Sequence, residues 1–194
     1  LFEVLKHARK NSAIFYNWED LRDISEPNSL THAAFYAGKK LGYHETGIML
    51  ADELLNYVKT FDSDFTFFYM GYTDWAGHKF GWMSEAYMDA VENSWKNIDK
   101  IVKSLPEEYQ VIITADHETG GLHLDENGEF QFVSEDHTST NVPVFAYGAR
   151  ADVFGGKTIE NVQIAKTIAA LFGVKIEGTD PENYPALHPV TEIK

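Results

Sequence analysis

The sequence predicts an α/β domain with helices on both faces of a mostly parallel sheet. Two continuous apolar runs of strand length, residues 64–70 and 110–115, alternate with segments of helical periodicity. Such runs are typical of strands that are buried on both faces of a parallel sheet. Polar side chains follow both runs directly, at the end of the strand where ligands bind in open α/β sheets. We therefore expect a three-layer α/β/α sandwich with a functional site at one edge of the sheet.

The individual elements follow from hydrophobic spacing and from turn and cap residues. The expected helices, which have apolar residues three or four positions apart, cover residues 1–10, 46–59, 84–105 and 158–172. The expected strands, which are short apolar runs, cover residues 12–16, 64–70, 110–115 and 141–148. Thr46 and Ser84 precede apolar helical patterns and are expected to cap them. Residues 122–132 predict a β-hairpin that turns at 125–128, whereas residues 17–42 predict irregular chain.

The composition excludes several classes of function. The chain has 194 residues, of which 44% are hydrophobic and 24% are charged, as expected for a single globular domain. It has no apolar run of 18 residues, so no membrane-spanning helix is expected. A net charge of −14 argues against nucleic-acid polymers and anionic membranes as partners. The absence of cysteine excludes thiolate zinc sites and cysteine nucleophiles. Neither the compartment nor the oligomeric state is predicted.

Five residues are candidate metal ligands: Asp74, His78, Asp116, His117 and His137. Asp74 and Asp116 come shortly after the two apolar runs. Carboxylates and imidazoles are the ligands of catalytic zinc, usually three for each ion with one position left open. Five such groups are nearly enough for two metals, which can stabilise both oxygens of an in-line displacement at phosphorus. We also expect glycine beside the ligands, as at Gly77, to permit tight turns with positive φ.

Two other motifs in the sequence offer alternative interpretations. His117 and Glu118 begin like a His-Glu-x-x-His zinc peptidase motif, but Gly121 stands where the second histidine is required. Residues 152–158 are similar to a phosphate-binding loop, but its first glycine is replaced by Ala151, and a helix-capping turn is the preferred interpretation.

Further histidines and aromatic residues leave two interpretations open. His123 is either a substrate contact or an exposed hairpin residue. The aromatic residues near the first ligand pair either line a substrate pocket or pack structurally; they are Trp75, Phe80, Trp82 and Tyr87. A structural role is expected for the remaining histidines, which are His7, His32, His44 and His188.

Three motifs together resemble the carboxyl-terminal part of the alkaline phosphatase superfamily, which includes type I phosphodiesterases and nucleotide pyrophosphatases. They are Asp74-x-x-x-His78, Thr114-Ala115-Asp116-His117, and His137-Thr138 leading into Val142-Pro143-Val144-Phe145-Ala146-Tyr147-Gly148. The resemblance implies that Asp74, His78 and His137 bind one metal and that Asp116 and His117 bind another. It implies zinc as the cofactor, with two ions per intact site and manganese as the alternative.

The same resemblance implies further site residues upstream of Leu1. In the family, the second metal also binds an aspartate and the Ser or Thr nucleophile of an earlier strand-to-helix turn. We therefore expect residues 1–194 to form the C-terminal portion of a single α/β metallohydrolase domain, with the nucleophile-bearing N-terminal part absent. This chain alone is then expected to be inactive.

The expected substrate is a small-molecule phosphate ester. Tyr69 stands where alkaline phosphatases proper carry a glutamate ligand for a third metal, and Gly77-His78-Lys79-Phe80-Gly81 is similar to the phosphodiesterase branch. Phosphodiester or nucleotide pyrophosphate hydrolysis is therefore the preferred hypothesis. Residues 115–121 are similar to bacterial alkaline phosphatases, so a phosphomonoesterase is the close alternative. A phosphomutase or sulfatase of the same superfamily and a degenerate, non-catalytic binding scaffold also stay open.

Overall fold

The computed structural model describes residues 1–118, 123–124, 127, 130–131, 137, 141–176 and 185–188. The α-helices are α1 (Phe2–His7), α2 (Gly38–Leu41), α3 (Tyr43–Thr60), α4 (Tyr72–Phe80), α5 (Glu85–Ser104) and α6 (Asn161–Leu171). The strands are β1 (Ser12–Tyr16), β2 (His32–Phe35), β3 (Phe65–Phe68), β4 (Gln110–Ile113), β5 (His123–Leu124), β6 (Phe130–Gln131) and β7 (Phe145–Gly148). Two 3₁₀ turns are η1 (Glu19–Ile24) and η2 (Ala151–Val153).

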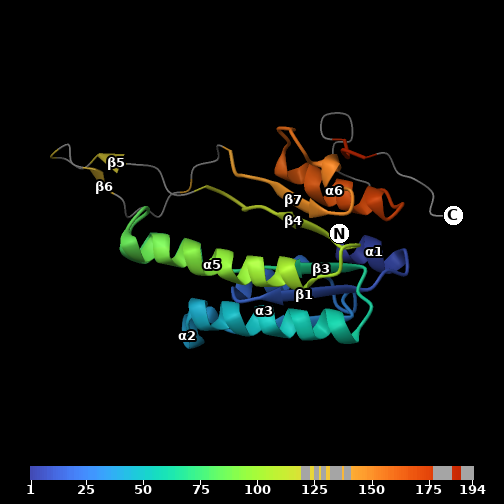
Figure 1. Cartoon of the computed structure of the whole chain (residues 1–194), viewed down its shortest axis with the longest axis horizontal. Coiled ribbons are helices and arrows are strands. Elements are labelled where there is room, and N and C mark those ends of the chain that lie inside the picture. The colour runs from blue at the N-terminus through green and yellow to red at the C-terminus, as the bar shows by residue number, and fades with distance from the viewer. Residues whose placement is uncertain are drawn as a thin grey trace.

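A parallel sheet with the strand order β2-β1-β3 forms the centre of the fold. Ala13 on β1 pairs with His32 on β2 and with Thr66 on β3, so the three strands end at the same edge. In Figure 1, α3 lies on one side of β1 and β3, and β4, β7 and α6 lie on the other side. The predicted fold class, a parallel sheet flanked by helices, is confirmed.

Side chains that alternate along β1 form two hydrophobic clusters, one on each face of the sheet. Phe15 points to the face covered by α3 and α5, where it packs with Leu50 and Ile101. Ile14 points to the opposite face, where it packs with Phe2 of α1. Burial of apolar surface on both faces is the main favourable contribution to the folding free energy of such a layered domain.

The strand that precedes Asp116 does not lie in the parallel sheet. β4 pairs with β7 in antiparallel register, Val111 opposite Tyr147, so the expectation of a parallel setting for this strand is wrong. A parallel pair needs a crossover connection, usually a helix. The described residues between β4 and β7 contain no helix but only the antiparallel pair β5–β6. This pair confirms the two strands of the predicted hairpin, whereas the turn predicted at 125–128 lies, apart from Asn127, outside the described residues.

One helix begins after the cap residue that the sequence predicted, and another helix does not. Ser84 caps α5 as predicted, because its hydroxyl accepts a hydrogen bond from the Tyr87 backbone N–H. Thr46 does not cap α3, which begins three residues earlier at Tyr43. Its hydroxyl instead donates to the carbonyl oxygen of Gly42 at 2.7 Å, inside the first turn.

Other elements were not predicted. The segment 17–42, expected to be irregular, contains η1, β2 and α2, and α4 follows β3 where a turn was expected. Within the described part of the chain, no helix combines the length and the apolar character needed to cross a bilayer.

Candidate metal centre

The helix α4 brings Asp74 and His78 onto the same side, because residues four positions apart share one face of a helix. The Oδ1 atom of Asp74 lies 3.2 Å from Nε2 of His78. Asp74 lies in the first turn, where a negative charge interacts favourably with the helix dipole. The tight turn expected at Gly77 is absent, since Gly77 lies inside α4.

His137 completes a group of three potential ligands. Its Nε2 atom lies 3.2 Å from Nε2 of His78 and 3.7 Å from Oδ1 of Asp74. Ligands about 2.0–2.1 Å from a tetrahedral zinc are separated from one another by about 3.3–3.4 Å, which is close to these spacings. Among the described residues, this is the group of ligand atoms that could hold a metal ion.

The surroundings of Asp74 also fit a cation. Its Oδ1 atom is buried and accepts no hydrogen bond from the residues that the structure describes. A buried carboxylate oxygen is costly unless it is paired or coordinates a metal. The side chains of the three residues are between 27% and 36% exposed, so the group is open to solvent. An open position is characteristic of catalytic rather than structural metal sites.

The second predicted pair lies beside this group. The His117 ring lies 3.8 Å from the His137 ring, measured between centroids. Its Nε2 atom is 3.7 Å from Oδ2 of Asp116, and its Nδ1 atom is 3.0 Å from the carbonyl oxygen of Glu118. Asp116 and His117 are thus near the first group without sharing its ligand cluster. Their assignment to a second metal stays a prediction.

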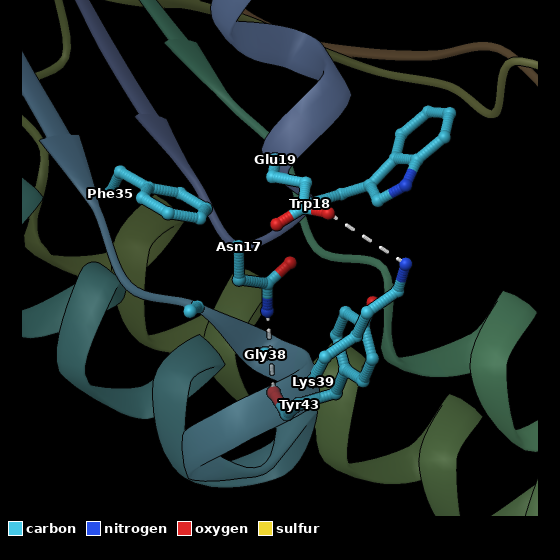
Figure 2. A pocket seen from close by; sticks show the side chains of 8 residues that line it. Asn17, Trp18, Glu19, Phe35, Gly38, Lys39 and Tyr43 are labelled. Carbon is cyan, nitrogen blue, oxygen red and sulfur yellow. Dashed lines mark hydrogen bonds and ion pairs between the residues drawn. The ribbon is translucent and has the colours of Figure 1, made fainter.

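Asn17, which the sequence did not single out, holds the start of α4. It is buried at the end of β1, and its Oδ1 atom accepts a hydrogen bond of 2.9 Å from the backbone N–H of Gly71, the residue that precedes α4. Its amide nitrogen donates to the carbonyl oxygen of Tyr43 (Figure 2). The same nitrogen also donates to the hydroxyl of Thr46. One side chain therefore connects β1, α3 and α4. The only sequence signal was a polar residue directly after an apolar strand.

The hollow shown in Figure 2 is too small to be the substrate site. Asn17 is one of the residues that line it, and the cavity volume is about 10 Å³, roughly the space of one water molecule. Lys39 and Glu19, which also line it, form an ion pair with 3.9 Å between Nζ and Oε1.

Two further side chains hold the backbone around the second pair. The amide of Asn161, the first residue of α6, donates to the carbonyl oxygen of Asp116 at 3.2 Å. The carboxylate of Glu118 accepts a hydrogen bond of 2.8 Å from the backbone N–H of Asn141. These contacts connect the segment after β4 to α6 and to the segment that precedes β7.

The pKa values of nearby tyrosines are raised by burial and by the charges of Asp74 and Asp116. Burial raises the pKa of Tyr69 above its ordinary value, and the negative charges of Asp116 and Asp74 raise it further. The pKa values of Tyr43 and Tyr87 are raised by burial and then by the charge of Asp74. The charge of Asp74 thus acts on all three tyrosines, and a negative charge in this position favours a bound cation.

Structural roles fit most of the other histidines whose surroundings are described. His44 stacks on Tyr72, with 5.5 Å between ring centroids. His32 stacks on Tyr57 at 4.7 Å, and His188 contacts the guanidinium of Arg150. His123 lies in β5, but its side chain falls outside the described residues.

The segment that is similar to a phosphate-binding loop forms the end of η2 and the turn that follows it. The predicted helix-capping role is wrong, because α6 begins at Asn161 and its N-cap is Glu160. Lys157 donates from Nζ to the carbonyl oxygen of Val153 at 2.7 Å, across η2 and the turn that follows it. The lysine is therefore engaged by the backbone.

Comparison with known proteins adds evidence about the family to which the chain belongs. A family model described as the Metalloenzyme superfamily matches residues 26–176, a range that includes all five predicted ligands. A comparison with curated proteins gives no match to this chain. The family implies divalent metal binding and supports a metal-dependent phosphoryl-transfer or related enzyme. The chain belongs to the Metalloenzyme superfamily and has an alkaline phosphatase-like fold.

Proposed function

We propose that the full-length protein is a metal-dependent phosphate ester hydrolase, with phosphodiester or nucleotide pyrophosphate bonds as its preferred substrates. The observation that carries the proposal is the convergence of Asp74, His78 and His137, whose ligand atoms lie within 4.8 Å of one another. The match of the chain to a metalloenzyme family supports the same conclusion.

In this proposal the three residues hold a divalent cation, zinc in preference to manganese. A cation bound there would supply positive charge for a phosphoryl oxygen and would lower the pKa of a bound water. His78 and His137 would each turn the Nε2 lone pair to the cation, which requires the imidazole proton to sit on Nδ1. Asp74 would contribute a negative charge from a fixed position on α4.

The second pair, Asp116 and His117, is proposed to hold a second cation. By the resemblance to the alkaline phosphatase superfamily, a Ser or Thr upstream of Leu1 would supply the attacking hydroxyl, and the displacement at phosphorus would be in line. Residues 1–194 would then be the C-terminal portion of one metallohydrolase domain. The activity is accordingly proposed for the full-length protein.

The presence of Tyr69 at its position supports phosphate diesters rather than monoesters as the substrates. By the resemblance, it occupies the position of the glutamate that binds a third metal in alkaline phosphatases proper. A phenol is protonated at neutral pH, and burial and the charges of Asp116 and Asp74 raise the pKa of Tyr69 further in the metal-free protein. A protonated phenol cannot replace an anionic ligand, which favours a site with two cations. A phosphomonoesterase is the second candidate, because residues 115–121 are similar to bacterial alkaline phosphatases.

The test is a screen of the full-length protein, loaded with zinc or with manganese, against three aryl substrates: a phosphate diester, a phosphate monoester and a sulfate. The expected result is the highest kcat/KM for the diester and loss of turnover in Asp74→Ala. Asp99→Ala is the matched control, since Asp99 pairs with Lys103 on the outer surface of α5. Higher kcat/KM for the monoester would favour the second candidate. Full activity of Asp74→Ala, or a preference for the sulfate, would overturn the proposal.

A further inference from the structure

Trp82 contacts two of the three proposed ligands from a sharp turn between α4 and α5. Gly81 and Met83, on either side of it, both have positive φ, +95° and +64°. Ser84 then caps α5. These two residues with positive φ, one on each side of Trp82, turn the chain between α4 and α5, and the indole lies against α4. The side chain is 5% exposed.

The indole lies against the backbone of α4 at Gly77. A Cβ atom added to Gly77 would lie 2.0 Å from Cζ3 and 2.1 Å from Cε3 of Trp82, much closer than any carbon contact allows. Glycine is an unfavourable residue inside a helix, and alanine is the most favourable. The need for glycine at this position is therefore steric, because any side chain would displace the indole.

The same indole contacts both imidazoles. The His78 ring lies 5.1 Å from it at an interplanar angle of 67°, and the His137 ring lies 6.0 Å from it at 70°. Both are edge-to-face contacts, which are favourable arrangements for aromatic rings. His78 belongs to α4, whereas His137 comes from a segment 59 residues later. Trp82 is thus a fixed surface against which two separate ligands are oriented.

We propose that Trp82 is a positioning residue of the metal centre, and that its indole, seated on Gly77, holds the His78 and His137 imidazoles in the orientation that directs both Nε2 atoms toward Asp74. This inference rests on the proposed function, since it assumes that the three residues bind a cation. The hydrogen-bonding capacity of the indole is not required. Its Nε1 atom is buried and has no hydrogen-bond partner among the described residues.

The test is the zinc affinity of the metal-free protein, measured by competition with a chelating dye. Trp82→Leu keeps an apolar side chain but removes the aromatic edge, and the affinity should fall by about 10- to 100-fold, as for other residues that orient metal ligands. Trp82→Phe keeps an aromatic edge and should retain the affinity to within about threefold. Trp75→Ala is the matched control: Trp75 lies on α4 beside Asp74, but its ring packs on Tyr43 and Phe80.

A double-mutant cycle tests the contact between the Trp82 indole and Gly77. Gly77→Ala should weaken zinc binding in the wild-type background, although alanine is the better helix former. In the Trp82→Leu background the same substitution should have little further effect, since the indole is already gone. Urea unfolding of each variant identifies any loss that is due to failure to fold.

The outcomes separate this inference from the proposed function. If Asp74→Ala abolishes zinc binding while folded Trp82→Leu and Gly77→Ala bind zinc as the wild type does, the role of Trp82 is overturned and the metal centre stands. Equal losses in Trp82→Phe and Trp82→Leu would also overturn it, because the aromatic edge would then be irrelevant. If the wild type binds no zinc, or Asp74→Ala binds it normally, the proposed function and this inference both fail.

Discussion

The Nε2 atoms of His78 and His137 lie 3.2 Å apart, although the two residues are 59 positions apart in the sequence. Without a cation, the N–H of one imidazole must donate a hydrogen bond to the nitrogen of the other, because two lone pairs at this distance repel. With a cation, both lone pairs can be used at once. The helix α4 therefore supplies two of the three proposed ligands, Asp74 and His78, and a second segment of the chain supplies His137.

The first prediction concerns the ligand from that second segment. In the full-length protein, His137→Ala should lower kcat/KM by about three orders of magnitude, because a metal contributes several kcal/mol to the stabilisation of the transition state. His44→Ala is the matched control, since His44 stacks on Tyr72 and lies outside the ligand group. Steady-state kinetics with an aryl phosphate diester measures both. Comparable activity of the two variants would remove His137 from the site.

The second prediction concerns Asn17. Asn17→Ala leaves the buried N–H of Gly71 and the carbonyl oxygen of Tyr43 without this partner. The free energy of unfolding in urea should fall by about 3 kcal/mol, since each unsatisfied buried group costs about 1–3 kcal/mol. Asn93→Ala on α5 removes one exposed hydrogen bond to Asp89 and should cost less than about 0.5 kcal/mol. Equal costs would show that Asn17 does not hold α4.

The third prediction concerns the cap of α5. Ser84→Ala removes the acceptor for the Tyr87 backbone N–H and should lower the free energy of unfolding by about 1 kcal/mol. Ser84→Asp supplies a carboxylate acceptor at the same position and should preserve it. Thermal or urea unfolding gives both values. A Ser84→Asp protein as unstable as Ser84→Ala would mean that capping does not explain the effect.

The fourth prediction concerns alkaline pH. Burial and the charges of Asp116 and Asp74 raise the pKa of Tyr69 in the folded protein above the ordinary value of 10.0. Below pH 10 this tyrosine is protonated in both states and has no effect on stability. Above it the unfolded chain ionises first, so stability falls as the pH rises toward the folded pKa.

This effect is measured by urea unfolding of the metal-free protein at about pH 9 and about pH 11. The wild type should lose more stability between the two than Tyr69→Phe, which cannot ionise. Tyr147→Phe alters an exposed tyrosine and is the matched control. An identical drop in the wild type and in Tyr69→Phe would contradict the assigned cause.

The sequence predicted those elements in which the hydrophobic spacing and the cap residues agree with the burial in the folded chain. The run 12–16 is buried on both faces as β1, and Ser84 caps the amphipathic helix α5 as expected. The segments at the start of α3 and at α4 depended instead on tertiary contacts. Gly42, with φ of +92°, and the contacts of Asn17 start α3 at Tyr43 rather than after Thr46.

The helix α4 shows why part of the site could not be predicted. It contains Gly77 and Thr73, which disfavour helix, and it is stabilised by packing against α5 and the indole of Trp82. The types of the proposed ligand residues and their order were visible in the sequence. The proximity of His137 to His78, the hydrogen bonds of Asn17 and the contact between Trp82 and Gly77 require the folded chain.

The most direct measurement of the metal centre is the amount of zinc bound per chain, determined by equilibrium dialysis and elemental analysis of residues 1–194. One tightly bound zinc in the wild type, and none in Asp74→Ala, is the expected result, because Asp116 and His117 alone are two ligands short of a tetrahedral site. Two tightly bound ions would contradict the proposed ligand sets. Unchanged binding in Asp74→Ala would contradict the central claim.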